Sequence, residues 1–178
     1  SKQLDEVLAG DEFDYVLGSV HFIDGWGFDD RRYFDFYEHY TKEELYEKYF
    51  ALLIEAAESG LFDVMAHPDL VKKYNIRLPQ EPLHLYQKAA KAFATADVAV
   101  EVSSAGLRKA CKEIYPSLAF LTCCQKENVP VTLGSDAHHP EQVGQDFDQL
   151  LAWLKAAGYE RIAVFTGRKI NFVSIGVI

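Results

Sequence analysis

Residues 134–138, with the sequence Gly-Ser-Asp-Ala-His, place a carboxylate and an imidazole two residues apart. They follow the apolar run 131–133, which predicts a buried strand. If that strand continues, its alternation puts Asp136 and His138 on one face, roughly 6.6 Å apart. An oxygen and a nitrogen ligand at this spacing suit one divalent metal ion, or two neighbouring ions. The segment therefore predicts part of a metal site.

Two more histidines close apolar runs earlier in the chain. His21 ends the run 15–20, and His67 ends the run 62–66. Pro68 cannot donate a hydrogen bond to a sheet, so it marks the end of the second run. The carboxyl ends of parallel strands meet on one side of a sheet, where barrel enzymes carry their chemistry. We therefore expect His21, His67, Asp136 and His138 to act as metal ligands.

Three further polar residues lie near these strand ends, each with two interpretations. Glu101 stands in an apolar strand, so it either supports a ligand histidine or forms a salt bridge with a loop cation. Arg108 presents a planar fork of donors that suits a phosphate, or it is an ordinary solvated arginine. His139 points away from the Asp136 face if the strand continues, but its direction is open if the strand ends there.

The order of elements predicts an α/β fold. Strands are expected at 15–20, 62–66, 98–102, 129–133 and 162–166. Thr41 and Glu44 form a capping box for a helix that reaches Ser59, and prolines 82, 116 and 140 suit the first turns of three more helices. The polar residues that end the strands lie 46, 34 and 35 residues apart, which is about the length of one βα unit.

Four or five βα units do not close an eight-stranded barrel of about 250 residues. The expected fold is therefore a partial, TIM-like barrel made of its C-terminal four to five units, with the early units absent. Such a sheet would expose its edges, so we expect an N-terminal segment or a homo-oligomer to cover them.

The segment 22–30 is long, aromatic and rich in glycine. It is expected to overhang the site, with Trp26 facing the substrate. The alternative is a surface loop whose aromatic side chains pack on the barrel.

Composition narrows the class of protein. The 178 residues carry a formal net charge of −9 without a Lys/Arg cluster, which argues against nucleic acid as the main partner. Neither a membrane-spanning run nor a signal peptide is visible. The three cysteines, two of them adjacent at Cys123 and Cys124, indicate packing thiols and a cytoplasmic setting.

Four motifs in this order resemble the polymerase-and-histidinol-phosphatase (PHP) family, and its histidinol-phosphatase branch most. They are the segments 18–26, 66–69, 101–109 and 134–138. The resemblance implies that residues 1–178 form a single PHP-type domain, its C-terminal portion. It also implies a distorted (βα)7 barrel and two or three divalent metal ions (zinc, manganese or iron). A metal-activated water would hydrolyse a small phosphorylated substrate.

Position by position, the resemblance makes His21 and His67 ligands of one metal, Asp136 a ligand of its neighbour and His138 a ligand of the third. Asp136 and Arg108 would take part in catalysis, with Arg108 gripping the substrate phosphate. His139 stands where relatives often carry a second arginine, so it and Trp26 are the other expected substrate contacts.

The family's His-x-His motif, its next ligand histidine and its bridging glutamate have no counterpart here, so the chain resembles the C-terminal two-thirds of a member. The expected function is that of a histidinol-phosphatase, which converts L-histidinol phosphate and water to L-histidinol and phosphate in histidine biosynthesis. We expect the chain alone to be weak or inactive. The alternatives are an amidohydrolase-type metal hydrolase and a non-catalytic remnant that acts as an assembly or binding module.

Overall fold

The computed structural model describes residues 12–176, and its centre is a four-stranded parallel sheet. The strands are β1 (Leu17–Gly18), β4 (Val64–Met65), β5 (Ala99–Ser103) and β6 (Val131–Gly134). They lie side by side in chain order, with each pair parallel. The predicted strand positions are confirmed for these four, although β1 and β4 are shorter than their apolar runs.

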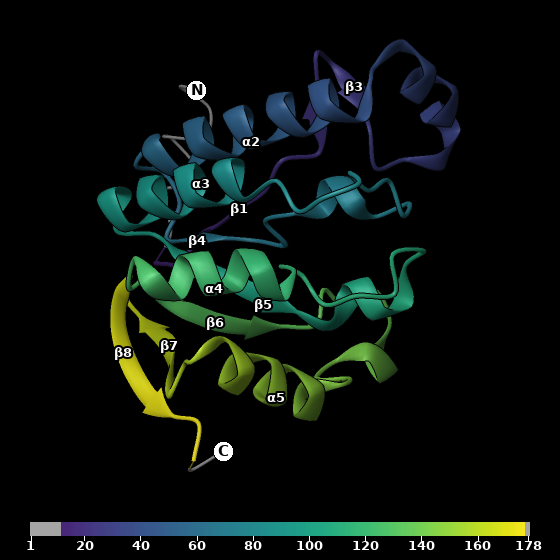
Figure 1. Ribbon diagram of the computed structural model, residues 1–178. Coiled ribbons are helices and arrows are strands. Elements are labelled where there is room, and N and C mark those ends of the chain that lie inside the picture. Colours follow the sequence, from purple (N-terminus) through teal and green to yellow (C-terminus); the bar gives the residue numbers. More distant parts are fainter. Residues whose placement is uncertain (1–11, 177–178) are drawn as a thin grey trace.

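An α-helix precedes or follows each strand. The four helices are α2 (Lys42–Glu58), α3 (Leu83–Ala96), α4 (Leu118–Lys126) and α5 (Phe147–Ala157). Short 3-10 segments are η1 (Arg31–His39), η2 (Leu70–Lys72), η3 (Ser104–Arg108) and η4 (Pro140–Gln142). Figure 1 shows the four α-helices stacked in chain order, from α2 at the top to α5 at the bottom. The predicted mixed α/β fold with a parallel sheet is confirmed.

Side chains cap the starts of α2 and α4, whereas α3 has Pro82 as its N-cap residue, just before its first turn, and α5 has no side-chain cap. The predicted capping box is present: the Thr41 hydroxyl accepts from the Glu44 amide, and the Glu44 carboxylate accepts from the Thr41 amide. In contrast, α4 is capped by Ser117, one residue after Pro116. Pro140 opens only the short η4, and α5 begins at Phe147. The predictions for Pro116 and Pro140 were therefore wrong in detail.

The fifth predicted strand does not extend the parallel sheet. It forms β7 (Arg161–Thr166), which pairs antiparallel with β8 (Lys169–Ser174). Gly167 and Arg168, both with positive φ, make the two-residue turn that a tight hairpin requires. The expectation of four to five βα units is thereby corrected to four parallel strands and a separate hairpin.

The hairpin turn reaches back to the start of the sheet. The amide of Arg168 donates to the Asp14 carbonyl at 2.8 Å, and its Nε contacts Asp63 at 2.9 Å. The rings of Tyr15 and Phe165 lie 5.4 Å apart. Residues just before β1 are therefore tied to the hairpin.

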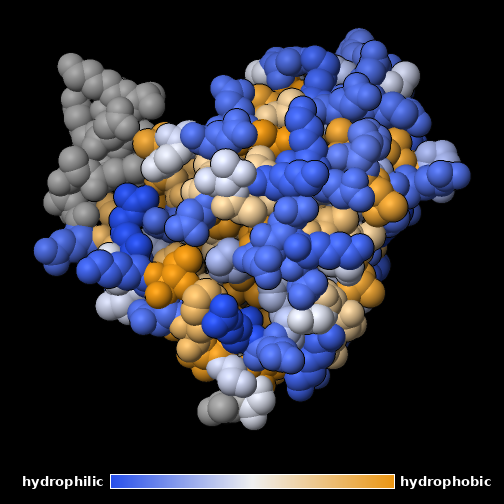
Figure 2. All heavy atoms as spheres, turned by 60° about the vertical axis from the view of Figure 1, so that its left-hand side comes forward, coloured by the Kyte–Doolittle hydropathy of each residue, from blue (hydrophilic) through white to orange (hydrophobic). Residues whose placement is uncertain are grey.

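One hydrophobic core lies between the helices and one face of the sheet. Val100 and Val102 of β5 belong to this core, and alternation points Glu101 to the opposite face. The molecular surface in Figure 2 is mainly hydrophilic, with hydrophobic residues in patches. Among residues 12–176 the helices are too short or too polar to cross a membrane. All three cysteines are buried and unpaired.

Candidate functional site

A cleft of about 410 Å³ opens beside the carboxyl ends of the parallel strands. Its lining residues are Tyr15, Leu17, Ser19, His21, Ala66, His67, Glu101, Thr132, Leu133, Gly134, Ser135 and Asp136. The structure thus brings together His21, His67 and Asp136, as the strand ends predicted. His138 and Arg108 lie next to this group and do not line the cleft.

His67 is one of two buried titratable residues that line the cleft, and Glu101 is the other. Its side chain is buried, and its Nδ1 has no hydrogen-bond partner among the described residues. Its ring centroid lies 5.2 Å from that of His21, with the rings nearly perpendicular. Burial and the neighbouring His21 lower the pKa of His67 to about 4, so the ring is neutral at pH 7. A neutral, buried imidazole nitrogen without a partner fits a metal ligand.

Glu101 supports His67 through the backbone. Its Oε2 accepts from the His67 amide at 2.9 Å, and its side chain occupies the space beside Gly134. A Cβ on Gly134 would lie 1.8 Å from Glu101 Oε1, so any other residue would displace the Glu101 side chain from this position. Burial raises the pKa of Glu101 to about 7. Of the two interpretations, support of the histidine is the one that this contact favours.

The Asp136 segment is a turn and does not continue the strand. β6 ends at Gly134, and Asp136 has a φ of +44°. The alternation expected for Asp136 and His138 is therefore wrong, because a left-handed residue breaks the period of two. His138 turns back instead, with its Nδ1 2.9 Å from the Asp136 carbonyl and 67% of its side chain exposed. His139 is exposed at the start of η4.

Arg108 ties η3 to this turn. Its Nη2 donates to the carbonyl of Ser135 and, at 3.5 Å, to that of Asp136. Its Nη1 lies 3.5 Å from the Ser104 hydroxyl. The guanidinium therefore holds the backbone that carries Asp136, a role that the sequence did not indicate.

Asp29 is a residue of the site that sequence reasoning missed. Its Oδ2 lies 3.1 Å from His21 Nδ1 and 3.1 Å from Lys73 Nζ. Partial burial raises its pKa, but the hydrogen bonds from His21 and Lys73 outweigh that effect and lower the pKa to about 2. Nothing in the sequence distinguishes Asp29 from Asp24 and Asp30 in the same loop, so this contact needed the structure.

Trp26 lies inside its own loop and not on the cleft. It is 5% exposed, and its indole nitrogen donates to the Tyr33 carbonyl at 3.0 Å. The ring stacks on Tyr40 and meets Tyr37 edge-on. The expected substrate contact through Trp26 is therefore not what the structure shows: packing of aromatic side chains buries the indole. The loop contacts the cleft through Asp29.

The described residues hold only part of a ligand set. Within residues 12–176, three His, Cys, Asp or Glu side chains are nowhere close enough together to hold a metal ion. His21 and His67 are adjacent, whereas Asp136 shares the cleft without completing a triad. The assignment of metal ligands thus stays a proposal.

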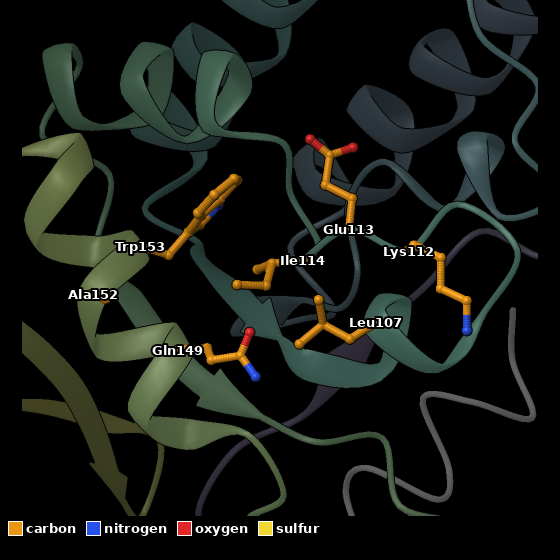
Figure 3. Close-up of a pocket in the computed structure, with 7 residues that line it drawn as sticks. All are labelled: Leu107, Lys112, Glu113, Ile114, Gln149, Ala152 and Trp153. Atoms are coloured by element: carbon orange, nitrogen blue, oxygen red, sulfur yellow. The ribbon is translucent and has the colours of Figure 1, made fainter.

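A second pocket of about 340 Å³ lies between α5 and the segment after β5. Figure 3 shows Gln149, Ala152 and Trp153 on one side, facing Leu107 and Ile114. Its surface is mainly apolar, and it contains none of the predicted site residues. The candidate site therefore remains the cleft.

The chain belongs to the PHP domain family, whose pattern matches residues 3–105. It is similar to a probable histidinol-phosphatase from Deinococcus radiodurans, with 36% identity over 96% of this chain and 64% of that protein. A probable histidinol-phosphatase from Clostridium acetobutylicum is 25% identical over 79% of this chain and 56% of that protein. The chain thus spans about three-fifths of these relatives.

The fold is also that of a solved structure. Histidinol phosphate phosphatase from Lactococcus lactis, solved with zinc, L-histidinol and phosphate, matches with a TM-score of 0.74 and 20% identity. The match covers 96% of this chain and 66% of that one. The chain therefore shares the fold of that phosphatase.

Proposed function

We propose that this chain carries the larger part of a metal-dependent phosphatase that hydrolyses L-histidinol phosphate to L-histidinol and phosphate. The observation that carries the proposal is the buried, unpartnered Nδ1 of His67 beside His21, in a cleft at the carboxyl ends of parallel strands. Similarity to the Deinococcus histidinol-phosphatase supports the choice of substrate. A cytoplasmic setting agrees with the three cysteines, and the net charge of −9 does not exclude a small phosphorylated substrate that is bound by metal ions and one or two cations.

In this proposal the chain is the C-terminal portion of one PHP-type domain, and its four parallel strands form an arc of a distorted (βα)7 barrel. The strand order β1-β4-β5-β6 follows the chain, and helices alternate with the strands, as in a barrel. The open sheet edges would be covered by an N-terminal segment or a second subunit.

His21 and His67 would hold one divalent ion, and two imidazoles suit zinc as well as manganese or iron. Asp136 and His138 would contribute to neighbouring ions of a two- or three-metal site. A bound divalent ion supplies hydroxide at neutral pH and polarises a phosphoryl oxygen.

The remaining groups position these ligands and the substrate. Glu101 fixes the backbone of His67, and Arg108 fixes that of Asp136. The other guanidinium N–H groups of Arg108 supply donors for a phosphate oxygen, and His139 lies exposed beside the same turn as a second contact. An amidohydrolase, which usually binds its metal through a lysine on a strand, is less favoured, because no lysine is among the described residues that line the cleft.

Phosphate release from L-histidinol phosphate tests the function. We expect weak activity from the chain alone, because its ligand set is partial. We expect zinc- or manganese-dependent turnover when it is fused to the part of the Deinococcus protein that it does not match. In that fusion His67→Gln should lower kcat/KM by about 100-fold or more, since losing one ligand or its support costs at least 10–100-fold. The exposed His84→Gln should leave it unchanged.

Two results would contradict the proposal. One is an inactive, folded fusion, and the other is release of ammonia from amide or amidine substrates in place of phosphate. The partial ligand set also leaves a non-catalytic binding module as the second candidate. Elemental analysis separates the two: tightly bound, near-stoichiometric metal in the purified chain counts against the binding module.

A further inference from the structure

The loop after β3 (Trp26–Gly27) brings one carboxylate against a proposed ligand histidine. Asp29 Oδ2 lies 3.1 Å from His21 Nδ1, and only 19% of the Asp29 side chain is exposed. An ionised carboxylate only accepts hydrogen bonds and repels a lone pair, so this short contact favours a hydrogen on Nδ1 of His21. In the neutral ring the lone pair is then on Nε2.

Asp29 is itself held by a second segment of the chain. Lys73 Nζ contacts both its Oδ2, at 3.1 Å, and its carbonyl oxygen, at 2.6 Å. The Tyr74 hydroxyl donates to the same carbonyl at 2.7 Å. These two residues follow His67 after a single turn, η2. One segment therefore carries His67 and also holds the carboxylate that contacts His21.

We propose that Asp29 is a positioning residue that holds the ring of His21 in the Nδ1–H tautomer and leaves Nε2 as its ligand atom. Water favours the other tautomer for a free histidine, so a protein contact is needed to select this one. Carboxylates that hold ligand histidines in this manner orient the ring and increase its basicity. The tautomer is a property of the chain itself, whereas its benefit to metal binding rests on the proposed function.

Long-range ¹H–¹⁵N correlation spectra of the histidine side chains test the tautomer directly. In the metal-free chain at pH 8.5 we expect His21, assigned from its absence in His21→Gln, to carry its hydrogen on Nδ1. In Asp29→Asn the side-chain amide can donate, so we expect His21 to change to the Nε2–H form. Asp30→Asn is the matched control, because Asp30 pairs with Arg32 and caps η1.

Three spectra would overturn the proposal: an Nε2–H form of His21 in the unaltered chain, an unchanged tautomer in Asp29→Asn, or the same change in Asp30→Asn. An unfolded chain would also show the Nε2–H form that water favours, so the Asp29→Asn spectrum counts only where its backbone amide resonances keep the folded pattern of the unaltered chain. Asp29→Glu, which keeps the acceptor, should restore part of the Nδ1–H signal.

Zinc affinity, measured by competition with a chromophoric chelator, tests the consequence. Asp29→Asn should weaken binding by about 10–100-fold, and Asp30→Asn should not. If the unaltered chain shows the Nδ1–H tautomer but binds no zinc, the positioning role of Asp29 stands and the proposed metal site is contradicted. If zinc binds equally well to Asp29→Asn and Asp30→Asn, zinc binding by His21 does not depend on Asp29.

Discussion

Replacing Lys72 with methionine is expected to lower the free energy of unfolding at pH 7 by about 3–5 kcal/mol. Lys72 is buried, and its Nζ lies 2.7 Å from Asp69 and 3.0 Å from Glu113. It also donates to the Ile114 carbonyl at 2.9 Å. Methionine fills a similar volume, but it leaves the fully buried Asp69 carboxylate without its cation. Urea denaturation of Lys72→Met and of the unaltered chain measures the difference in their free energies of unfolding.

Lys48→Met is the matched control for this change. Lys48 forms an ion pair with Asp24 at 2.9 Å, and the two side chains are 44% and 53% exposed. Water and salt screen such a pair, so its loss should lower the free energy of unfolding far less than Lys72→Met does. If the free energy of unfolding fell by the same small amount in Lys72→Met and Lys48→Met, the buried Asp69–Lys72 pair would not stabilise the fold as we describe.

The Lys72 cluster also supports the site. Asp69 accepts from the Ser117 amide at 2.8 Å, which fixes the start of α4. The segment that leads into α4 carries Tyr115, whose ring meets that of His67 edge-on, with the ring centroids 6.3 Å apart. We therefore place the Asp69–Lys72 pair among the contacts that keep His67 in position.

Removing His67 or Glu101 is expected to change the pH dependence of stability in opposite directions in the metal-free chain. The folded-state pKa of His67 is about 4, below its usual 6.5. Between these values only the unfolded chain takes up the proton, so His67 makes stability rise with pH. The pKa of Glu101 is about 7, above its usual 4.5. Between those values only the folded chain holds the proton, so Glu101 makes stability fall with pH.

The two contributions largely cancel between pH 4.5 and 6.5 in the unaltered chain. Relative to the unaltered chain, the free energy of unfolding of Glu101→Gln should rise by about 3 kcal/mol as pH rises from 4.5 to 7. That of His67→Gln should fall by about 3 kcal/mol, relative to the unaltered chain, as pH rises from 4 to 6.5. Urea denaturation across this range measures both. Parallel curves for the two variants and the unaltered chain would contradict the environments assigned to these groups.

The sequence predicted the sheet and the side on which the site lies. Apolar runs that end in His21, His67 and Asp136 are a strong pattern, because parallel strands bring their carboxyl ends together. The capping box at Thr41 was equally predictable, since it depends on residues three apart. The pairing of β7 with β8 was missed, although Gly167 between two β-branched runs is typical of a hairpin.

What could not be predicted depends on long-range contacts. Asp29 meets His21 across a loop whose other acidic residues look the same in the sequence. The turn at Asp136 depends on Arg108, 28 residues away, holding its backbone. Trp26 was expected at the cleft because aromatic loops often face substrates, but the surrounding rings bury it. Local patterns do not contain this information.

The pairing of His21 and His67 as ligands of one divalent ion is tested most directly by a zinc titration followed in the histidine side-chain ¹⁵N spectrum. We predict that resonances of both residues change together with one midpoint, with His67 bound through Nδ1 and His21 through Nε2. The exposed His39 and His84 serve as references in the same spectrum and should not respond. A spectrum in which His67 stays unchanged while zinc binds elsewhere would contradict the metal site that we propose.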